Sequence, residues 1–279
     1  MPPDFPLYVG RRYESPFRAS RIEAMLEGGR DYTPADFGRM QMDAKTGEAP
    51  LLLPRLLGIK PADAAGQQAV ALLAKWDQVM DAGKPEPLIY TAWVRRLQRA
   101  LVEARLGATQ WHSYYDPTLI ARLLDADPGK AGTLLESSLD DALAALQKEY
   151  GADMTLWRWG DAHRAALKSQ MLGAIPILGR LFDASLPVSG GDETVNRAGI
   201  GRNDGVHFPD VHGPGYRGVF DLSDLDRSRF IIATGQSGDP LSPHYDDLAT
   251  SWRDGNAITL SGTADEVAAR GIGRQRFVP

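Results

Sequence analysis

Apolar residues in the first half of the chain recur at the spacing of α-helices. Ile89, Trp93, Leu97 and Leu101 follow one another at intervals of four residues, which predicts a long amphipathic helix over residues 87–106. Similar apolar spacing, with suitable start and stop residues, predicts further helices within 15–28, 33–49, 62–80, 116–124 and 135–150. Residues 15–150 are therefore expected to form a helical layer.

Several residues predict where these helices begin and end. Ser15, Thr33 and Asp116 each stand before a proline. In that arrangement the side-chain oxygen accepts hydrogen bonds from unpaired backbone N–H groups, and proline occupies the first helical position. Pro54 interrupts an apolar run, and we expect it to bend or end a helix because proline lacks a backbone donor.

The pattern changes after Gly151, where short apolar runs alternate with Gly, Pro, Asp and Ser. Such punctuation is typical of tight turns between strands. Residues 151–189 are therefore interpreted as a transition, and residues 190–279 as a strand and turn region. Strands are expected within 193–201, 215–223, 228–235 and 256–261.

Two more helices are predicted near the end of the chain. The first would run from Ser242 to a stop at Gly255, with Tyr245, Leu248 and Trp252 pointing inward. The second would begin after Thr263, where Thr-Ala-Asp-Glu resembles a helix cap.

Composition excludes some classes of function. The chain has 279 residues, no Cys and a formal net charge of -5, so it has no disulfide, thiol nucleophile or Cys-bound zinc. Both charge signs are interspersed, and the basic pair Arg95-Arg96 fits a solvated helix face, so no nucleic-acid surface is expected. No apolar run reaches the roughly 18 residues of a membrane span, and residues 1–14 read as an extended arm without the features of a signal peptide.

The strand and turn region also contains candidate catalytic residues. Ser237 with His244 and Asp246 would offer a Ser-His-Asp set, although Gly-Gln-Ser-Gly-Asp lacks the second Gly of a nucleophile elbow; a simple turn is the preferred interpretation. The five His lack metal-ligand spacing, and the Asp-rich turns lack the spacing of a calcium loop. No metal or cofactor is therefore expected in this chain.

The segment from Trp157 to His163 reads WRWGDAH and leaves two interpretations open. Its rings would form a stacking platform for a ligand, or the Trp side chains would fill a core with His163 hydrogen-bonded between layers. The second arrangement is the more common for such a cluster and is preferred. From the residues alone, the chain is an α+β protein without a complete catalytic set.

Several motifs, in order along nearly the whole chain, resemble those of one enzyme family. They are SPFRASRIEAML from Ser15, DFGRMQMD from Asp36, ALLAKWDQVMD from Ala71, WRWGDAH from Trp157, GGDETVN from Gly190, HGPGYR from His212 and GQSGDPLSPHYDDLATSWRDG from Gly235. The chain is similar to the C-terminal part of the large subunit of penicillin acylases. These are N-terminal-nucleophile amidohydrolases, and the family includes acyl-homoserine-lactone acylases. Two motifs depart from the usual forms: GGDETVN is shorter and more acidic, and HGPGYR has Gly215 where Ser is common.

The resemblance implies a fold and a mechanism. The fold would be a four-layer αββα sandwich, with residues 1–279 as a single C-terminal portion of the acylase domain. In such enzymes the Ser that begins the large subunit attacks a linear amide, and its own α-amino group acts as the base. An Asn side chain and a backbone N–H hold the oxyanion. The Ser and the Asn would lie upstream of this sequence, so the chain alone is expected to be inactive.

One functional residue is implied within the chain itself. In the family, an Arg in the pattern aromatic-Arg-Ala before Arg-Ile lies beside the active site and supports the oxyanion Asn and the bound substrate. Phe17-Arg18-Ala19 followed by Arg21-Ile22 matches this pattern, which makes Arg18 the candidate site residue. A cation in the first turn of a helix is otherwise unfavourable, because it lies near the positive end of the helix dipole. An exposed Arg at a helix start is the weaker interpretation.

The resemblance also implies partners. They are the remaining part of the acylase, meaning the small subunit and the N-terminal part of the large subunit, and a small-molecule amide such as a β-lactam side chain or an N-acyl-homoserine lactone. Calcium in the complete enzyme would bind through residues mostly upstream, and that enzyme would be periplasmic or secreted. One alternative is a catalytically inactive, standalone binding or scaffold module of the same fold. Another, Pro2 as a secondary-amine base, has little support.

Overall fold

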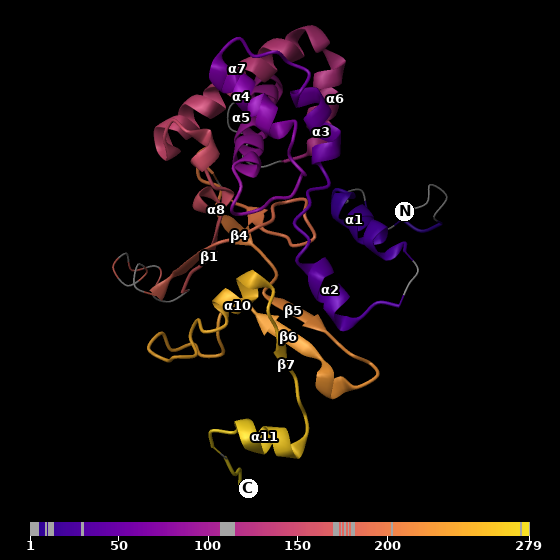
Figure 1. Cartoon of the computed structure of the whole chain (residues 1–279), viewed down its shortest axis with the longest axis vertical. Coiled ribbons are helices and arrows are strands. Elements are labelled where there is room, and N and C mark those ends of the chain that lie inside the picture. Colours follow the sequence, from indigo (N-terminus) through magenta and orange to yellow (C-terminus); the bar gives the residue numbers. More distant parts are fainter. Residues whose placement is uncertain are drawn as a thin grey trace.

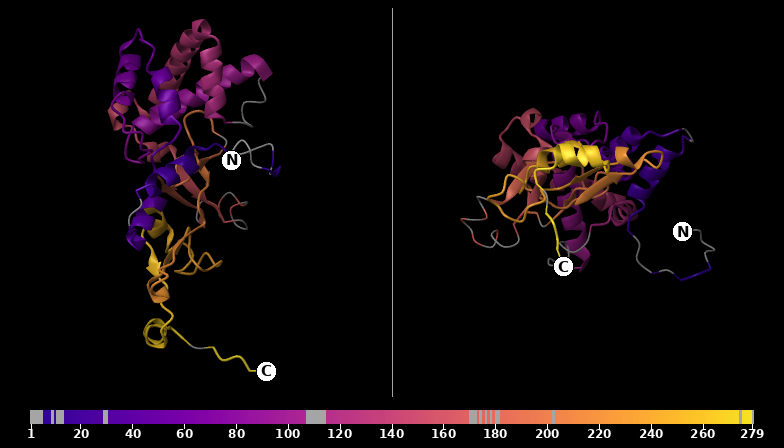
Figure 2. Two further views of the ribbon diagram at one scale, coloured as in Figure 1. Left: turned by 90° about the vertical axis from the view of Figure 1, so that its right-hand side faces the viewer. Right: turned by 90° about the horizontal axis from the view of Figure 1, so that it is seen from below.

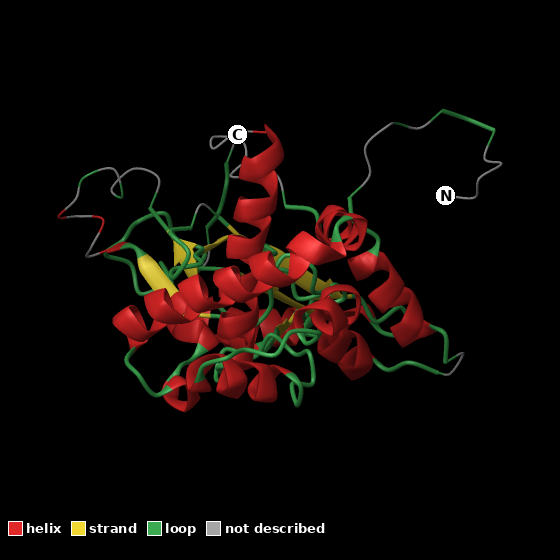
Figure 3. Ribbon diagram, turned by 90° about the horizontal axis from the view of Figure 1, so that it is seen from above, coloured by secondary structure: helices red, strands yellow, loops and turns green. Residues whose placement is uncertain are grey.

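The computed structural model describes residues 6–8, 10, 14–28, 31–106, 115–169, 173, 175, 177, 179, 182–201, 203–273 and 275–278. The molecule is elongated, with a helical body of α3 to α8 at one end, two small sheets beyond it and α11 at the other end (Figures 1 and 2). Seen from above, helices cover the strands (Figure 3). Most of the predicted arm 1–14, including Pro2, lies outside the described residues.

The helices follow the predicted order. They are α1 (Phe17–Leu26), α2 (Pro34–Gln41), α3 (Ala49–Leu56), α4 (Ala64–Leu73), α5 (Glu86–Leu106), α6 (Pro117–Ala126), α7 (Pro128–Tyr150), α8 (Trp159–Ala162), α10 (Ala249–Asp254) and α11 (Ala264–Arg270), with short 3-10 helices at Met154–Leu156 and Leu225–Arg227. The predicted helices within 87–106 and 135–150 are confirmed by α5 and α7. The helix predicted within 62–80 is shorter, because α4 ends at Leu73; Trp76 and Met80 are still buried, but from the loop that follows.

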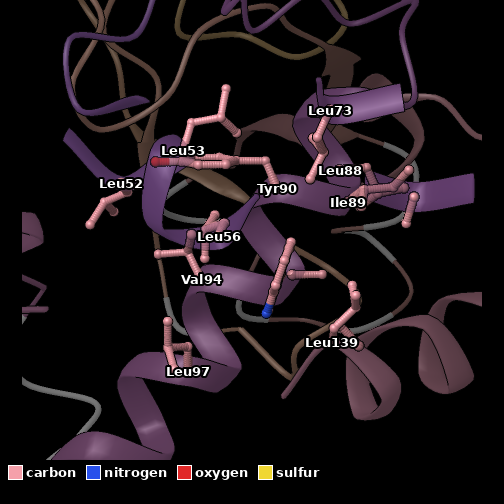
Figure 4. Packing of buried hydrophobic residues seen from close by; sticks show 14 of the residues in the cluster. Leu52, Leu53, Leu56, Leu73, Leu88, Ile89, Tyr90, Val94, Leu97 and Leu139 are labelled. Atoms are coloured by element: carbon pink, nitrogen blue, oxygen red, sulfur yellow. The ribbon is translucent and has the colours of Figure 1, made fainter. Parts of the chain in front are cut away.

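Helix α5 is the centre of the helical body. Leu88, Ile89 and Trp93 are completely buried on it, and Leu139 of α7 packs against the same cluster (Figure 4). The Trp93 indole N–H donates to the Leu135 carbonyl at 3.0 Å. Residues 87–94 are buried without a break. The first half of α5 is therefore a buried helix rather than an amphipathic one, because α4, α6, α7 and α8 all contact it.

The predicted helix caps at Thr33, Asp116 and Thr263 are confirmed. The Thr33 hydroxyl accepts from Asp36 N while the Asp36 carboxylate accepts from Thr33 N, and the Asp116 carboxylate accepts from Thr118 N at 2.8 Å. The predicted Ser15 cap is wrong: Pro16 holds the cap position of α1 without a side-chain bond. The Ser15 hydroxyl instead donates to the Glu193 carboxylate, which lies far away in the sequence.

The strands form two separate sheets. The first has the order β2 (Ala184–Pro187), β1 (Arg164–Leu167), β4 (Asp210–His212) and β3 (Gly199–Ile200), with an antiparallel β1–β2 pair and a parallel contact between β1 and β4 at Ala165 and Asp210. The second is antiparallel and has the order β5 (Tyr216–Val219), β6 (Arg229–Ile232) and β7 (Ile258–Thr259).

Four predicted strands exist but are shorter than the patterns suggested, and β1, β2 and β4 were not predicted. These three are only three or four residues long, and none of them has a strictly alternating pattern of burial. The helix predicted from Ser242 begins only at Ala249, because Ser242 uses its hydroxyl and carbonyl in local turns with His244 N and Tyr245 N. Its stop at Gly255 is confirmed, with Gly255 at a φ of 75°.

The WRWGDAH segment belongs to the core, as the preferred interpretation held. His163 is completely buried, its ring stacks on Trp159 with centroids 4.3 Å apart, and Nδ1 lies 2.6 Å from the Phe208 carbonyl. Burial lowers the pKa of His163 to about 4, so it is neutral and joins the helical body to the loop before β4.

Candidate functional site

The first turn of α1 meets the loop of residues 190–197. Arg18 Nε donates to the Thr194 carbonyl at 2.9 Å, which joins two residues far apart in the chain. A pocket of about 450 Å³ opens there. We call this cavity the Arg18 pocket. Its lining residues are Glu14, Ser15, Arg18, Ala19, Ile22, Tyr115, Asp192, Glu193 and Arg197.

The GGDETVN motif forms the loop on one side of this pocket. Gly190 has a φ of 109°, and a Cβ there would overlap the Asn196 carbonyl, so the close turn requires glycine. The buried Thr194 hydroxyl donates to the Asn196 carbonyl at 2.7 Å and accepts from Gly191 N at 3.0 Å. The loop is thereby a rigid support for the carbonyl that binds Arg18.

The segment 43–48 holds this loop from behind. Asn196 N donates to the Asp43 carbonyl at 2.8 Å, and Gly47 N donates to the Glu193 carbonyl at 3.2 Å. Arg21 of α1 binds the Asp43 carboxylate through two hydrogen bonds, from Nε at 3.1 Å and from Nη2 at 2.7 Å. The two arginines of the motif FRASRI therefore act together: Arg21 fixes α1, and Arg18 faces the pocket.

Charges of both signs surround Arg18. Burial and the neighbouring Arg197 lower the pKa of Arg18, while Glu193 and Glu14 oppose that shift. Burial also raises the pKa of Glu193, and the hydrogen bond from Ser15 acts in the opposite direction. The pocket thus offers two guanidinium groups close to one partly desolvated carboxyl group.

Tyr115, which lies just before α6, lines the pocket, and Arg95 of α5 packs against the Tyr115 ring. The Arg95 guanidinium carbon lies 3.6 Å from the centre of the Tyr115 ring, and Arg95 forms an ion pair with Asp192. The side chain of Arg95 is only 11% exposed, so its assignment to a solvated helix face is wrong. Asp192 also accepts from Ile200 N at 3.0 Å, which ties the loop to β3.

Glu48 lies beside Tyr115. The Tyr115 hydroxyl donates to Glu48 Oε2 at 2.7 Å. Burial raises the pKa of Glu48 to about 8, against the effects of the Tyr115 hydrogen bond and of Arg95. The sequence interpretation missed Glu48, Arg95 and Tyr115. One signal was available, since Glu48 is a charged residue directly before the apolar run of α3.

The alternative Ser-His-Asp set does not form. The Ser237 hydroxyl accepts from Asp239 N at 3.1 Å, and His244 Nδ1 lies 2.9 Å from Asp247 Oδ2 rather than from Asp246. The contact between Ser237 and His244 is one of backbones, from Ser237 N to the His244 carbonyl at 3.0 Å. This confirms the interpretation of the segment as a turn.

Among the described residues, no group of three or more His, Asp or Glu side chains is arranged to hold a metal ion. No helix in the same part of the chain has the length and apolar character to cross a membrane.

Comparison with known proteins identifies the family. The family model described as penicillin amidase matches residues 1–269. The chain belongs to the penicillin amidase family. The family resemblance seen in the motifs is thereby confirmed.

Relatives of this penicillin amidase family member are bacterial acylases. Penicillin acylase 2 proenzyme of Pseudomonas sp. (strain SE83) is 30% identical over 99% of this chain, and acyl-homoserine lactone acylase QuiP of Pseudomonas syringae pv. syringae (strain B728a) is 30% identical over 52% of it. The chain spans 37% of the first relative and 17% of the second.

A solved structure confirms the fold. Thermostable penicillin G acylase from Alcaligenes faecalis matches 99% of this chain and 55% of its own, with a TM-score of 0.52 and 15% identity. The predicted α+β fold, rich in helices and consistent with an N-terminal-nucleophile hydrolase, is thus confirmed.

Proposed function

We propose that this chain is the C-terminal part of an amidohydrolase that cleaves linear amides by N-terminal Ser catalysis, with the nucleophile and the oxyanion Asn in a part of the protein outside this sequence. The family match supports this proposal, and so does the fact that the chain spans only 37% of the length of a penicillin acylase relative. Candidate substrates are β-lactam side chains and N-acyl-homoserine lactones, in keeping with the names of the relatives.

The proposal rests on the way in which Arg18 lines the pocket while its Nε is bound to the Thr194 carbonyl. Within the described residues, the bond from Nε to the Thr194 carbonyl is the one hydrogen bond that Arg18 makes. The two terminal nitrogens of the guanidinium thus remain to serve groups that enter the Arg18 pocket. In the proposed enzyme they support the oxyanion Asn and the bound substrate, as the family resemblance implies.

The other parts of the proposal concern the complete enzyme. Its partners are the small subunit and the N-terminal part of the large subunit, which would also supply most ligands of a calcium ion. The complete enzyme would be periplasmic or secreted. We propose no metal or cofactor held by this chain itself.

Arg18 provides the test. In the complete acylase that contains this chain, Arg18→Ala is expected to lower kcat/KM for a chromogenic anilide by about 100-fold, the scale of losing one preorganised donor at an oxyanion. Arg18→Lys should recover only part of the activity, because an ammonium group does not reproduce the planar fork of the guanidinium. The midpoint of thermal unfolding should change little for either variant, since α1 has no buried residue.

Two results would contradict the proposal. Equal losses of activity and thermal stability in Arg18→Ala would make this Arg structural. Turnover of the anilide by the purified 279-residue chain alone, sensitive to a serine-directed inhibitor, would place the nucleophile within this sequence. A complete reading frame without a processing junction before Ser would instead favour the standalone binding module.

A further inference from the structure

The carboxyl group of Glu48 lies at the centre of a buried polar cluster behind the Arg18 pocket. Glu48 is 7% exposed and sits one residue before α3, where Leu52, Leu53 and Leu56 continue into the hydrophobic core. An acid in such a place is costly unless it is paired or neutral. Its cost to stability suggests a role beyond packing.

We propose that Glu48 is a positioning residue of the candidate site: it anchors the Tyr115 ring, and through that ring Arg95 and the 190–197 loop, in the arrangement from which Thr194 holds Arg18. This inference rests on the proposed function of the Arg18 pocket. It adds a residue that does not touch the pocket itself.

The contacts form a continuous series from Glu48 to Arg18. Tyr115 donates to Glu48, the Tyr115 ring supports Arg95, and Arg95 pairs with Asp192. Asp192 precedes Glu193 and Thr194 in the loop, and the Thr194 carbonyl accepts from Arg18. Each step joins groups that are buried or half-buried, where hydrogen bonds and ion pairs are screened least by water.

A second route connects the same two ends through the backbone. Gly47, the neighbour of Glu48, donates its N–H to the Glu193 carbonyl at 3.2 Å. A Cβ on Gly47 would overlap the Cβ of Phe17, the residue before Arg18, so α1 lies directly against this segment. Displacement of Glu48 would therefore disturb the loop and α1 together.

The electrostatic surroundings favour a neutral Glu48. Tyr90 and Arg95 face it from α5 and Tyr115 from just before α6, and Glu193 and Asp192 act on it from the loop. Only Arg95 among these carries a positive charge, and Arg95 is already paired with Asp192. A protonated Glu48 still accepts the Tyr115 hydrogen bond through its carbonyl oxygen, whereas an ionised Glu48 would place a second negative charge behind an acidic loop.

Three variants of the complete acylase test the inference through its kinetics. Glu48→Ala is expected to lower kcat/KM for a chromogenic anilide by about 10- to 100-fold, since a displacement of about 1 Å at a positioned group has that scale of effect. Glu48→Gln keeps a neutral acceptor for Tyr115 and should stay within about threefold of the wild type. Glu48→Gln should also lose any alkaline decline in kcat/KM that the wild type shows near the pKa of Glu48.

Ser138→Ala is the matched control. Ser138 is buried on α7 and accepts from the Trp93 indole at 3.1 Å, and it does not line the Arg18 pocket. This variant should lower the melting temperature without the loss of kcat/KM. Equal kcat/KM losses in Glu48→Ala and Ser138→Ala, at similar melting temperatures, would overturn the inference.

A chemical readout keeps the inference testable if the enzyme proves inactive on amides. Tetranitromethane nitrates exposed, ionisable tyrosines, and mass spectrometry can quantify the reaction at Tyr115 in the 279-residue chain. Nitration of Tyr115 should rise several-fold in Glu48→Ala and stay low in Glu48→Gln, with the exposed Tyr8 as an internal standard. Unchanged nitration of Tyr115 in Glu48→Ala would show that Glu48 does not anchor this ring, whatever reaction the pocket supports.

Discussion

The helical body buries its large apolar side chains, whereas the β5–β6–β7 sheet and its adjoining loops leave several of theirs exposed. The helical body encloses Trp93, Leu97 and Leu139 completely. The sheet and its adjoining loops leave Phe220, Leu222 and Leu225 more than half exposed. The helical body thus completes its own core, whereas the sheet presents a surface suited to contact with further protein. The remaining part of the proposed acylase would cover it.

Truncation of Trp93 should give the largest effect. Trp93→Ala removes a completely buried ring and its indole N–H bond, and is expected to lower the free energy of unfolding by about 3–5 kcal/mol. Urea denaturation followed by far-UV circular dichroism measures the change. A loss under about 1 kcal/mol would mean that the helical body is packed more loosely than the structure indicates.

The second-largest difference between the helical body and the sheet should lie in the pH dependence of stability. Between pH 4.5, the ordinary pKa of its carboxyl group, and about 8, Glu48 binds a proton when folded and releases it on unfolding. The free energy of unfolding should therefore fall as pH rises through this window, by about 1.4 kcal/mol per pH unit. From pH 5 to pH 7 the decline from this group would amount to about 2–3 kcal/mol.

Glu48→Gln should remove this slope, which is measured by urea denaturation of both proteins across the pH range. Asp221 near the sheet has the opposite tendency, because its hydrogen bonds with Ser223 lower the pKa of its carboxyl group. The stability that Asp221 contributes is fully present above the ordinary pKa of its carboxyl group. It is lost as pH falls through the lowered pKa of the folded state. A wild-type slope that persists in Glu48→Gln would show that another buried group causes it.

The smallest effect on stability should come from the sheet region. Leu222→Ser and Leu225→Ser alter side chains that are 87% and 64% exposed, and each should change the free energy of unfolding by less than about 0.5 kcal/mol. Both substitutions should nevertheless reduce self-association of the chain in sedimentation velocity, since they shrink an exposed apolar surface. Destabilisation above about 2 kcal/mol would place these residues in a core and end the contrast with the helical body.

Local signals in the sequence predicted many of the helices. The periodicity around Trp93 located α5, and the Thr33 and Asp116 caps located the starts of α2 and α6. Each of these signals acts within one or two helical turns, so neighbouring residues suffice to read it. Strand β1 could not be found in this way, because it has only four residues and Ala165 alone among them is buried, so it lacks the alternating pattern that marks a strand locally.

The candidate site was also only partly predictable from local signals. Arg18 could be named because its local motif matches a family pattern, and its role there remains a proposal. Arg95 was taken for a solvated cation, since its place on α5 says nothing of the Tyr115 ring that covers it or of Asp192. Without knowledge of its burial, Glu48 would be interpreted as an ordinary surface acid.

The sequence by itself determined the family of this protein, the caps of α2 and α6, the position of α5, and Arg18 as the candidate site residue. Only the tertiary structure decided that Thr194 holds Arg18, that Tyr115 lines the pocket with Arg95 packed on its ring, and that Glu48 lies buried behind it. The physical reason is the distance along the chain over which each effect acts. Helix propensity and capping depend on near neighbours, whereas burial, ion pairing and the pKa of a carboxyl group depend on whatever the fold brings beside it.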